Sequence, residues 1–157
     1  MQTGQCQAET RIGLYMGETQ SGVYVYNKTK ETFLAFKVKV ADSVLGRLVG
    51  LLGKRSLKPD GGVWIVPCNS IHTIGMLFKI DVIMVDRNLR VVGLHELVRP
   101  FSVTSPNFQA ESVIELPGHT IFKSHTEIGD QLVIERYEKS PAPATTPRNE
   151  AQAMRNG

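Results

Sequence analysis

The chain has 157 residues, of which 41% are hydrophobic and 21% are charged, and its formal net charge is +3. A chain of this length suits one domain with a tail, and this composition excludes wholesale disorder. Lysine and arginine are scattered rather than clustered, so the basic stripe typical of nucleic-acid-binding proteins is absent from the sequence. No stretch reaches the roughly 20 consecutive apolar residues of a membrane span.

The two ends of the chain differ in composition from its middle. Residues 1–20 are polar without a sustained period, which predicts a loosely ordered arm. Because this arm lacks a basic segment followed by an apolar one, it does not resemble a secretory signal, and we expect a cytoplasmic protein. Residues 139–157 contain three prolines and few large apolar side chains, which predicts a disordered tail. A single β-rich domain is therefore expected over residues 21–138.

The first half of this domain predicts a hairpin followed by a helix. The segments "SGVYVYN" and "TFLAFKVKV" are rich in β-favouring residues, and the second would place Leu34, Phe36, Val38 and Val40 on one face. The period changes in "ADSVLGRLVGLLGK", where leucines recur at helical spacing before Gly53. This pattern predicts a short amphipathic helix.

The second half predicts five further strands, which are "GVWIVP", "KIDVIMVD", "RVVGLHELV", "SVIELPG" and "QLVIER". The segment "DRNLR" predicts a tight turn that Asp86 starts, and "HTIFKSHTEIGD" predicts one helical turn. About seven short strands with one substantial helix predict an all-β fold, a small antiparallel sandwich or barrel.

Four separated motifs resemble the family known as domain of unknown function 192, which occurs in bacteria and archaea. These motifs are "VYNKTKETFLAFKVKVADS", "GRLVGLLGKRSL", "GVWIVPCNSIHTIGMLFKIDVIMVD" and the pair "VIELPGHT" with "IGDQLVIE". They follow the order of the family and cover roughly residues 23–135. The resemblance implies a small β-rich fold of sandwich or barrel type. It implies no activity, because the biochemical role of the family is not established.

The resemblance also indicates where the characteristic residues of the family fall. In this sequence they are Arg47, Gly50, Leu51, Asp81, Asp86, Ile114, Glu115, Leu116, Pro117, Gly129 and Asp130. One departure is His119, which stands where many members have glycine.

Cys68, His72 and Met76 are spaced four residues apart. In an extended segment such residues point to one face, where sulfur and imidazole ligands suit a soft metal ion. A second hypothesis makes Cys68 a nucleophile that His72 activates as a base. A third makes Cys68 a small buried hydrophobe and His72 a hydrogen-bonded histidine.

Asp81 interrupts an apolar strand, sharing one face with Ile83 and Val85. A carboxylate in such a setting must be paired or must accept hydrogen bonds. We consider Arg47 as its partner, since a guanidinium binds a carboxylate through two hydrogen bonds. One hypothesis is that Asp81 ties the helix, or the backbone amides of a loop, to the sheet. The alternative is that Arg47, His72, Asp81 and Glu115 line one pocket for a small polar ligand.

These observations favour a non-catalytic binding or accessory module over an enzyme. We expect a small ligand or a protein as its partner, and neither a cofactor nor nucleic acid. The alternative is a metal-binding protein or a cysteine-dependent enzyme that uses Cys68 and His72.

Overall fold

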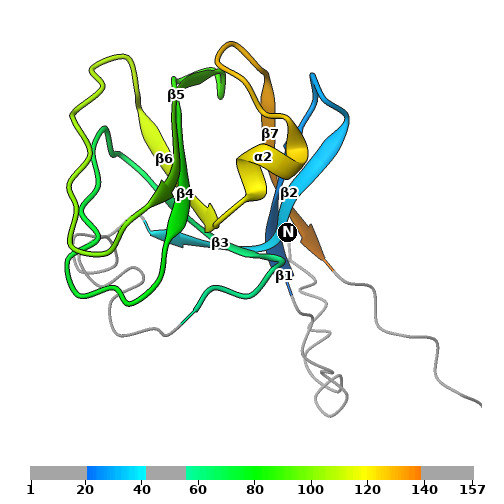
Figure 1. The fold of residues 1–157 in the computed structure, drawn as a ribbon. Coiled ribbons are helices and arrows are strands. Elements are labelled where there is room, and N and C mark those ends of the chain that lie inside the picture. The colour runs from blue at the N-terminus through cyan, green and yellow to red at the C-terminus, as the bar shows by residue number, and fades with distance from the viewer. Residues whose placement is uncertain (1–20, 42–55, 139–157) are drawn as a thin grey trace, which may run out of the picture. The chain divides into compact units, whose positions relative to one another are not determined.

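A computed structural model of the chain describes residues 21–41 and 56–138 (Figure 1). The N-terminal arm, the helix expected within residues 41–54 and the C-terminal tail were predicted for segments that lie almost wholly outside this range. They remain predictions, and so does the division of the chain into arm, domain and tail.

The described residues form seven strands and one short helix, and every strand expected from the sequence is present. The strands are β1 (Ser21–Asn27), β2 (Thr32–Ala41), β3 (Gly61–Ile65), β4 (Ile80–Val85), β5 (Val91–Val98), β6 (Ser112–Pro117) and β7 (Leu132–Glu138). The helix α2 (Thr120–Ser124) is the helical turn that was predicted before the last strand.

All seven strands belong to one sheet with the order β5-β4-β6-β3-β2-β1-β7, which is not closed into a barrel. The expectation of a β-rich fold is confirmed. The sheet is mixed rather than wholly antiparallel, because β2 and β3 pair in parallel while β3–β6, β4–β6 and β4–β5 are antiparallel. A parallel pair cannot be joined by a tight hairpin and needs a longer crossover connection. Residues 42–60 separate β2 from β3 in the chain, and 42–55 lie outside the described range.

The prediction for the faces of β2 was wrong in part. Leu34 and Val38 are buried, but Phe36 and Val40 are exposed, and Ala35 is buried instead. The pairing with β1 shifts register twice, between Val23↔Val38 and Val25↔Ala35 and again before Tyr26↔Phe33. Each shift inserts an extra residue and reverses the alternation that a regular strand would keep.

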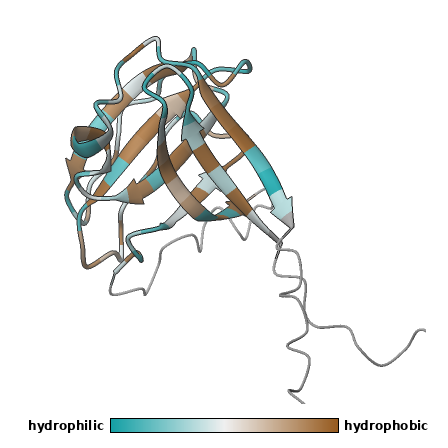
Figure 2. Ribbon diagram, turned by 90° about the vertical axis from the view of Figure 1, so that its right-hand side faces the viewer, coloured by the Kyte–Doolittle hydropathy of each residue, from teal (hydrophilic) through white to brown (hydrophobic). Residues whose placement is uncertain are grey.

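The core lies on both faces of β4 and β6. Figure 2 shows the hydrophobic residues, in brown, concentrated along the strands of the sheet. Ile83 and Val85 pack with residues of β1 and β2 in one cluster, while Ile80, Val82 and Met84 pack in a second. The helix α2 lies between the β4–β6 part and the β1–β2 part of the curved sheet (Figure 1), and its Ile121 belongs to the first cluster.

Candidate functional site

Asp81 is fully buried, and its carboxylate accepts two backbone hydrogen bonds. Its Oδ1 lies 2.9 Å from the amide nitrogen of Leu97, and its Oδ2 lies 2.9 Å from that of Ile121. The prediction that this carboxylate accepts hydrogen bonds from backbone amides is therefore confirmed. Arg47, the partner considered from the sequence, lies outside the described residues.

Each of these amides lies where the regular backbone hydrogen bonding is interrupted, one at a bulge and one at the start of a helix. Leu97 adopts a left-handed φ of 51° where the β4–β5 pairing shifts register between Ile80↔Val98 and Val82↔His95. Ile121 lies in the first turn of α2, whose N-cap residue His119 makes no side-chain capping hydrogen bond. Since amides in the first turn of a helix lack intrahelical partners, Asp81 provides from β4 an acceptor that His119 does not provide.

His119 itself has a φ of 70°, in the left-handed region. Glycine reaches this region without the steric penalty that a side chain brings, which explains physically why a glycine suits this position.

The other two aspartates of the family pattern also stabilise turns. Asp86 Oδ1 accepts hydrogen bonds from the amides of Asn88 at 2.8 Å and Arg90 at 2.9 Å, as predicted for a residue that starts a turn. Asp130 is buried, and its Oδ2 accepts hydrogen bonds from Asn27 Nδ2 at 2.8 Å and from the Glu127 amide at 2.9 Å.

Of the four candidates for one ligand pocket, Arg47 lies outside the described residues, and the other three do not share one face of the sheet. Asp81 is paired with Leu116, and Val82 is paired with Glu115, across β4 and β6. Because residues directly opposite each other share a face and neighbours along a strand do not, the Asp81 and Glu115 side chains point to opposite faces of the sheet. His72 is exposed on the loop before β4.

The segment with Cys68, His72 and Met76 is not one extended strand. A turn closes where the Met76 amide donates to Thr73 O at 3.2 Å, and Gly75 has a φ of 81°. His72 is exposed and Met76 is buried, and the Cys68 thiol donates to Ser70 O at 2.9 Å. Within residues 21–41 and 56–138, no three His, Cys, Asp or Glu side chains are grouped to hold a metal ion. The metal-site and nucleophile hypotheses for Cys68 and His72 stay predictions.

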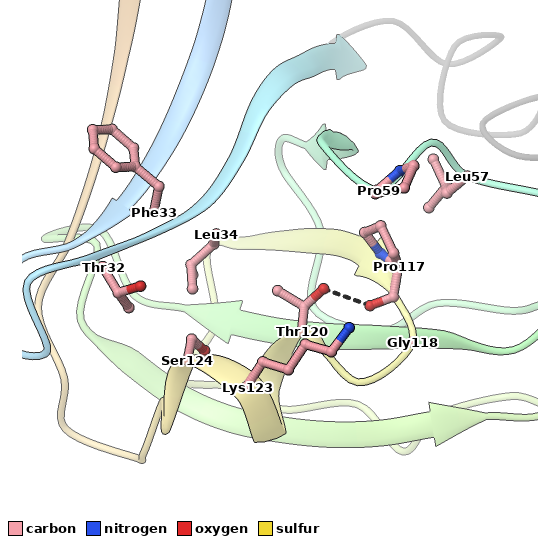
Figure 3. A pocket seen from close by; sticks show the side chains of 10 residues that line it. All are labelled: Thr32, Phe33, Leu34, Leu57, Pro59, Pro117, Gly118, Thr120, Lys123 and Ser124. Carbon is pink, nitrogen blue, oxygen red and sulfur yellow. Dashed lines mark hydrogen bonds between the residues drawn. The ribbon is translucent and has the colours of Figure 1, made fainter.

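A pocket of about 340 Å³ lies between β2, the loop before β3 and the β6–α2 turn (Figure 3). Its lining residues are Thr32, Phe33, Leu34, Leu57, Pro59, Pro117, Gly118, Thr120, Lys123 and Ser124. We call this space the β2–α2 pocket.

The two sides of the β2–α2 pocket differ in character. Leu34 supplies apolar surface from β2, whereas the Phe33 ring points away from α2 and stacks on Phe36 (Figure 3). Lys123 extends along the α2 side toward Thr120 (Figure 3). The Thr120 hydroxyl donates to Pro117 O at 2.6 Å, so its oxygen keeps lone pairs for a further donor. Among the described residues that line the pocket, none is acidic and Lys123 is the one cation.

Asp81 supports this pocket without lining it. Its hydrogen bond to the Ile121 amide fixes α2, and the same helix carries Thr120 and Lys123 of the pocket wall. Sequence reasoning missed the pocket because its lining residues are common types on three separate segments. The helical turn was predicted, but only the folded chain brings α2 beside β2.

Two further pockets have a volume similar to that of the β2–α2 pocket. One of about 320 Å³ is lined by Cys68, Glu111 and three neighbours, and one of about 360 Å³ contains Lys37, Lys39 and Lys58. Lys37 Nζ lies 2.6 Å from Asp60 Oδ2. This hydrogen bond lowers the pKa of the exposed Asp60 carboxyl and raises the pKa of Lys37.

The described helix is too short to cross a bilayer, and no other helix in the described residues has the length and apolar character of a span. The observations define a small β-rich protein built on one mixed seven-stranded sheet.

Comparison with known proteins then identifies its family. The family model DUF192, described as an uncharacterized ACR, matches residues 25–134. A UPF0127 protein of Thermococcus sibiricus is 36% identical over 124 residues, which cover 74% of this chain and 77% of that protein. A UPF0127 protein of Pyrococcus horikoshii is 34% identical over 114 residues, which cover 69% and 96%. The chain therefore belongs to the DUF192 family.

Two bacterial crystal structures have a similar fold. A proposed transcription regulator from Sinorhizobium meliloti superposes with a TM-score of 0.63 at 18% identity, covering 73% of this chain and 94% of that one. A protein of unknown function from Novosphingobium aromaticivorans gives a TM-score of 0.61 at 16% identity, covering 71% and 82%. At these identities the likeness shows the fold alone.

Proposed function

We propose that this protein is a non-catalytic binding module that holds a small ligand in the β2–α2 pocket. The observation that carries the proposal is the pocket wall, where the apolar Leu34 side chain of β2 faces the polar groups of α2 (Figure 3). A volume of about 340 Å³ lies at the lower end of the range for small-molecule sites. A rigid support for α2 favours such a role, because a preformed site loses less entropy on binding.

The lining favours a ligand with an apolar body and one negative charge. Leu34 and Leu57 offer surface for the apolar body, and the Lys123 ammonium offers a donor for a carboxylate. A charge-assisted hydrogen bond is stronger than a neutral one, and no acidic lining residue opposes it. A short-chain carboxylate meets these conditions.

The test is a titration with hexanoate followed by amide chemical shifts in a ¹H–¹⁵N spectrum. We expect saturable shifts at Leu34, Thr120 and Lys123, and a weaker effect of 1-hexanol, which lacks the charge. Lys123→Gln should raise the Kd for hexanoate about tenfold by removing the charge-assisted bond.

The matched control is Lys28→Gln, which removes an exposed lysine from the β1–β2 turn and should leave the Kd unchanged. Shifts that cluster away from the pocket, or equal losses in the two variants, would contradict the proposal. Cytoplasmic location and the exclusion of nucleic acid stay predictions from the sequence.

A further inference from the structure

Two loops next to β4 and β5 expose large apolar side chains. Ile74 and Leu77 precede β4 and are 54% and 67% exposed, while Phe101 and Val103 follow β5 and are 67% and 69% exposed. We call these four residues the apolar patch. None of them lines the β2–α2 pocket, so the patch is a separate feature of the molecule.

Hydrogen bonds hold the two loops together as a short ribbon. The Thr104 amide donates to Ile71 O at 2.9 Å, and His72 and Val103 form an antiparallel bridge. Residues opposite each other in such a bridge point to one face, so His72 and Val103 share a face. Both are exposed, as are Ile74 and Phe101 in the adjoining turns, whereas Thr104 is buried.

The fully buried Thr73 fixes the end of this ribbon. Its Oγ1 donates to Arg99 O at 2.7 Å and accepts a hydrogen bond from the Ser102 amide at 2.9 Å. The Phe101 amide also donates to Thr73 O at 3.0 Å. Exposure of the apolar patch is therefore imposed by the ordered backbone around Thr73.

Positive charges stand at the base of the two loops. Ile80 and Val98 are paired across β4 and β5, so Lys79 and Arg99 occupy the next positions outward, and both are exposed. Residues 67–80 and 97–110 contain no aspartate or glutamate. The charged side chains within these two segments are thus of one sign.

We propose that the apolar patch docks the protein on the surface of a bilayer that contains anionic phospholipids. Apolar side chains that project from a rigid ribbon can enter the boundary between headgroups and acyl chains. Lys79 and Arg99 at the base then meet the negatively charged headgroups, an attraction that salt weakens. A protein partner of ordinary composition would bring charges of both signs, which this one-signed border does not match.

The test is sedimentation of the full chain with vesicles of phosphatidylglycerol and phosphatidylcholine, compared with pure phosphatidylcholine vesicles. We expect binding to the anionic vesicles that weakens with added salt, and little binding to the neutral ones. Leu77→Ser with Phe101→Ser should lower the partition coefficient at least about tenfold, because each change removes apolar area from the contact. Lys79→Gln with Arg99→Gln should reduce binding to anionic vesicles only.

The matched control is Phe122→Ser with Ile128→Ser. These residues are 68% and 69% exposed, so the control removes an equally exposed aromatic and aliphatic pair outside the patch. We expect it to bind anionic vesicles as the wild type does.

Three results would overturn the proposal: no binding to anionic vesicles, equal binding to neutral vesicles, or an equal loss in the control. Analytical ultracentrifugation without lipid provides a fourth. Self-association that Leu77→Ser with Phe101→Ser abolishes, with no vesicle binding by the wild type, would assign the patch to contact between two copies of the chain.

Discussion

Asp81 and Thr73 are both fully buried polar side chains, and both hold irregular backbone by hydrogen bonds. Asp81 joins a strand to a bulge and to the helix α2 inside the curved sheet. Thr73 joins two loops at the edge of the molecule, next to exposed apolar side chains. The region around Asp81 supports one wall of the β2–α2 pocket, and the region around Thr73 exposes the apolar patch to solvent.

The comparison teaches that buried polar residues support both regions, although only Asp81 could be singled out from the sequence. Asp81 does not line the β2–α2 pocket, and Thr73 does not belong to the apolar patch. In both regions the groups proposed to meet a ligand or a membrane are ordinary side chains such as Lys123 and Phe101. Substitutions at the two supports should separate their effects on stability from their effects on binding.

The largest effect is expected for Asp81→Ala. The change leaves the partly buried Leu97 amide and the buried Ile121 amide without their acceptor, which should lower the free energy of unfolding by about 3 kcal/mol. Asp81→Asn keeps one acceptor oxygen and should cost roughly half as much. Urea denaturation measures both. An unfolding midpoint equal to that of the wild type would refute the supporting role of Asp81.

A smaller effect is expected for Thr73→Val, which keeps the side-chain shape and removes the hydroxyl. The Ser102 amide and the Arg99 carbonyl lose a partner, but they lie in loops that can open locally to water. We expect a loss of about 1–2 kcal/mol in the free energy of unfolding. Amide hydrogen exchange should accelerate in residues 71–76 and 99–104. Equal acceleration throughout the sheet would contradict the distinction between the two regions.

A stabilising effect is expected for His119→Gly. The histidine occupies a left-handed conformation with a φ of 70°, which costs a residue with a side chain more than it costs glycine. Thermal unfolding should show a gain of up to about 1 kcal/mol. Lys123→Gly serves as the control, because a glycine inside the helix should destabilise by about 1 kcal/mol. A loss of stability in His119→Gly would mean that this side chain makes compensating contacts.

The smallest effect is expected at Cys68. Its thiol donates a hydrogen bond to Ser70 O, which favours the protonated form over the reactive thiolate. The chain has one other cysteine, Cys6, which the test replaces by serine. In this Cys6→Ser background, Cys68 should react with iodoacetamide no faster than an ordinary thiol. Reaction more than tenfold faster would revive the hypothesis of a cysteine nucleophile activated by His72.

Most of the fold could be predicted from the sequence, because seven apolar segments with β-favouring residues stand between clear turn signals. The parallel pairing of β2 and β3 was not predicted, although the strand, helix and strand expected in this part of the chain suit a crossover. The faces of β2 were misassigned because bulges reverse the alternation, and nothing local in "TFLAFKVKV" signals where the extra residues of β2 fall.

Less of the candidate site could be predicted. The need of Asp81 for hydrogen bonds followed from its apolar neighbours, but its donors are backbone amides 16 and 40 residues away, which no side-chain pattern encodes. Asp81 and Glu115 looked like members of one pocket, yet the pairing of β4 with β6 sends them to opposite faces. The register of strand pairing decides which side chains share a face of the sheet, and it could not be predicted from this single sequence.

The most direct test of the account is native-state hydrogen exchange at the Leu97 and Ile121 amides in the wild type and in Asp81→Asn. We predict slow exchange of both amides in the wild type. In the variant, exchange of at least one of them should be about tenfold faster or more, since an asparagine amide cannot accept both hydrogen bonds. Unchanged exchange of both amides in Asp81→Asn would contradict the claim that Asp81 holds the bulge and α2 in place.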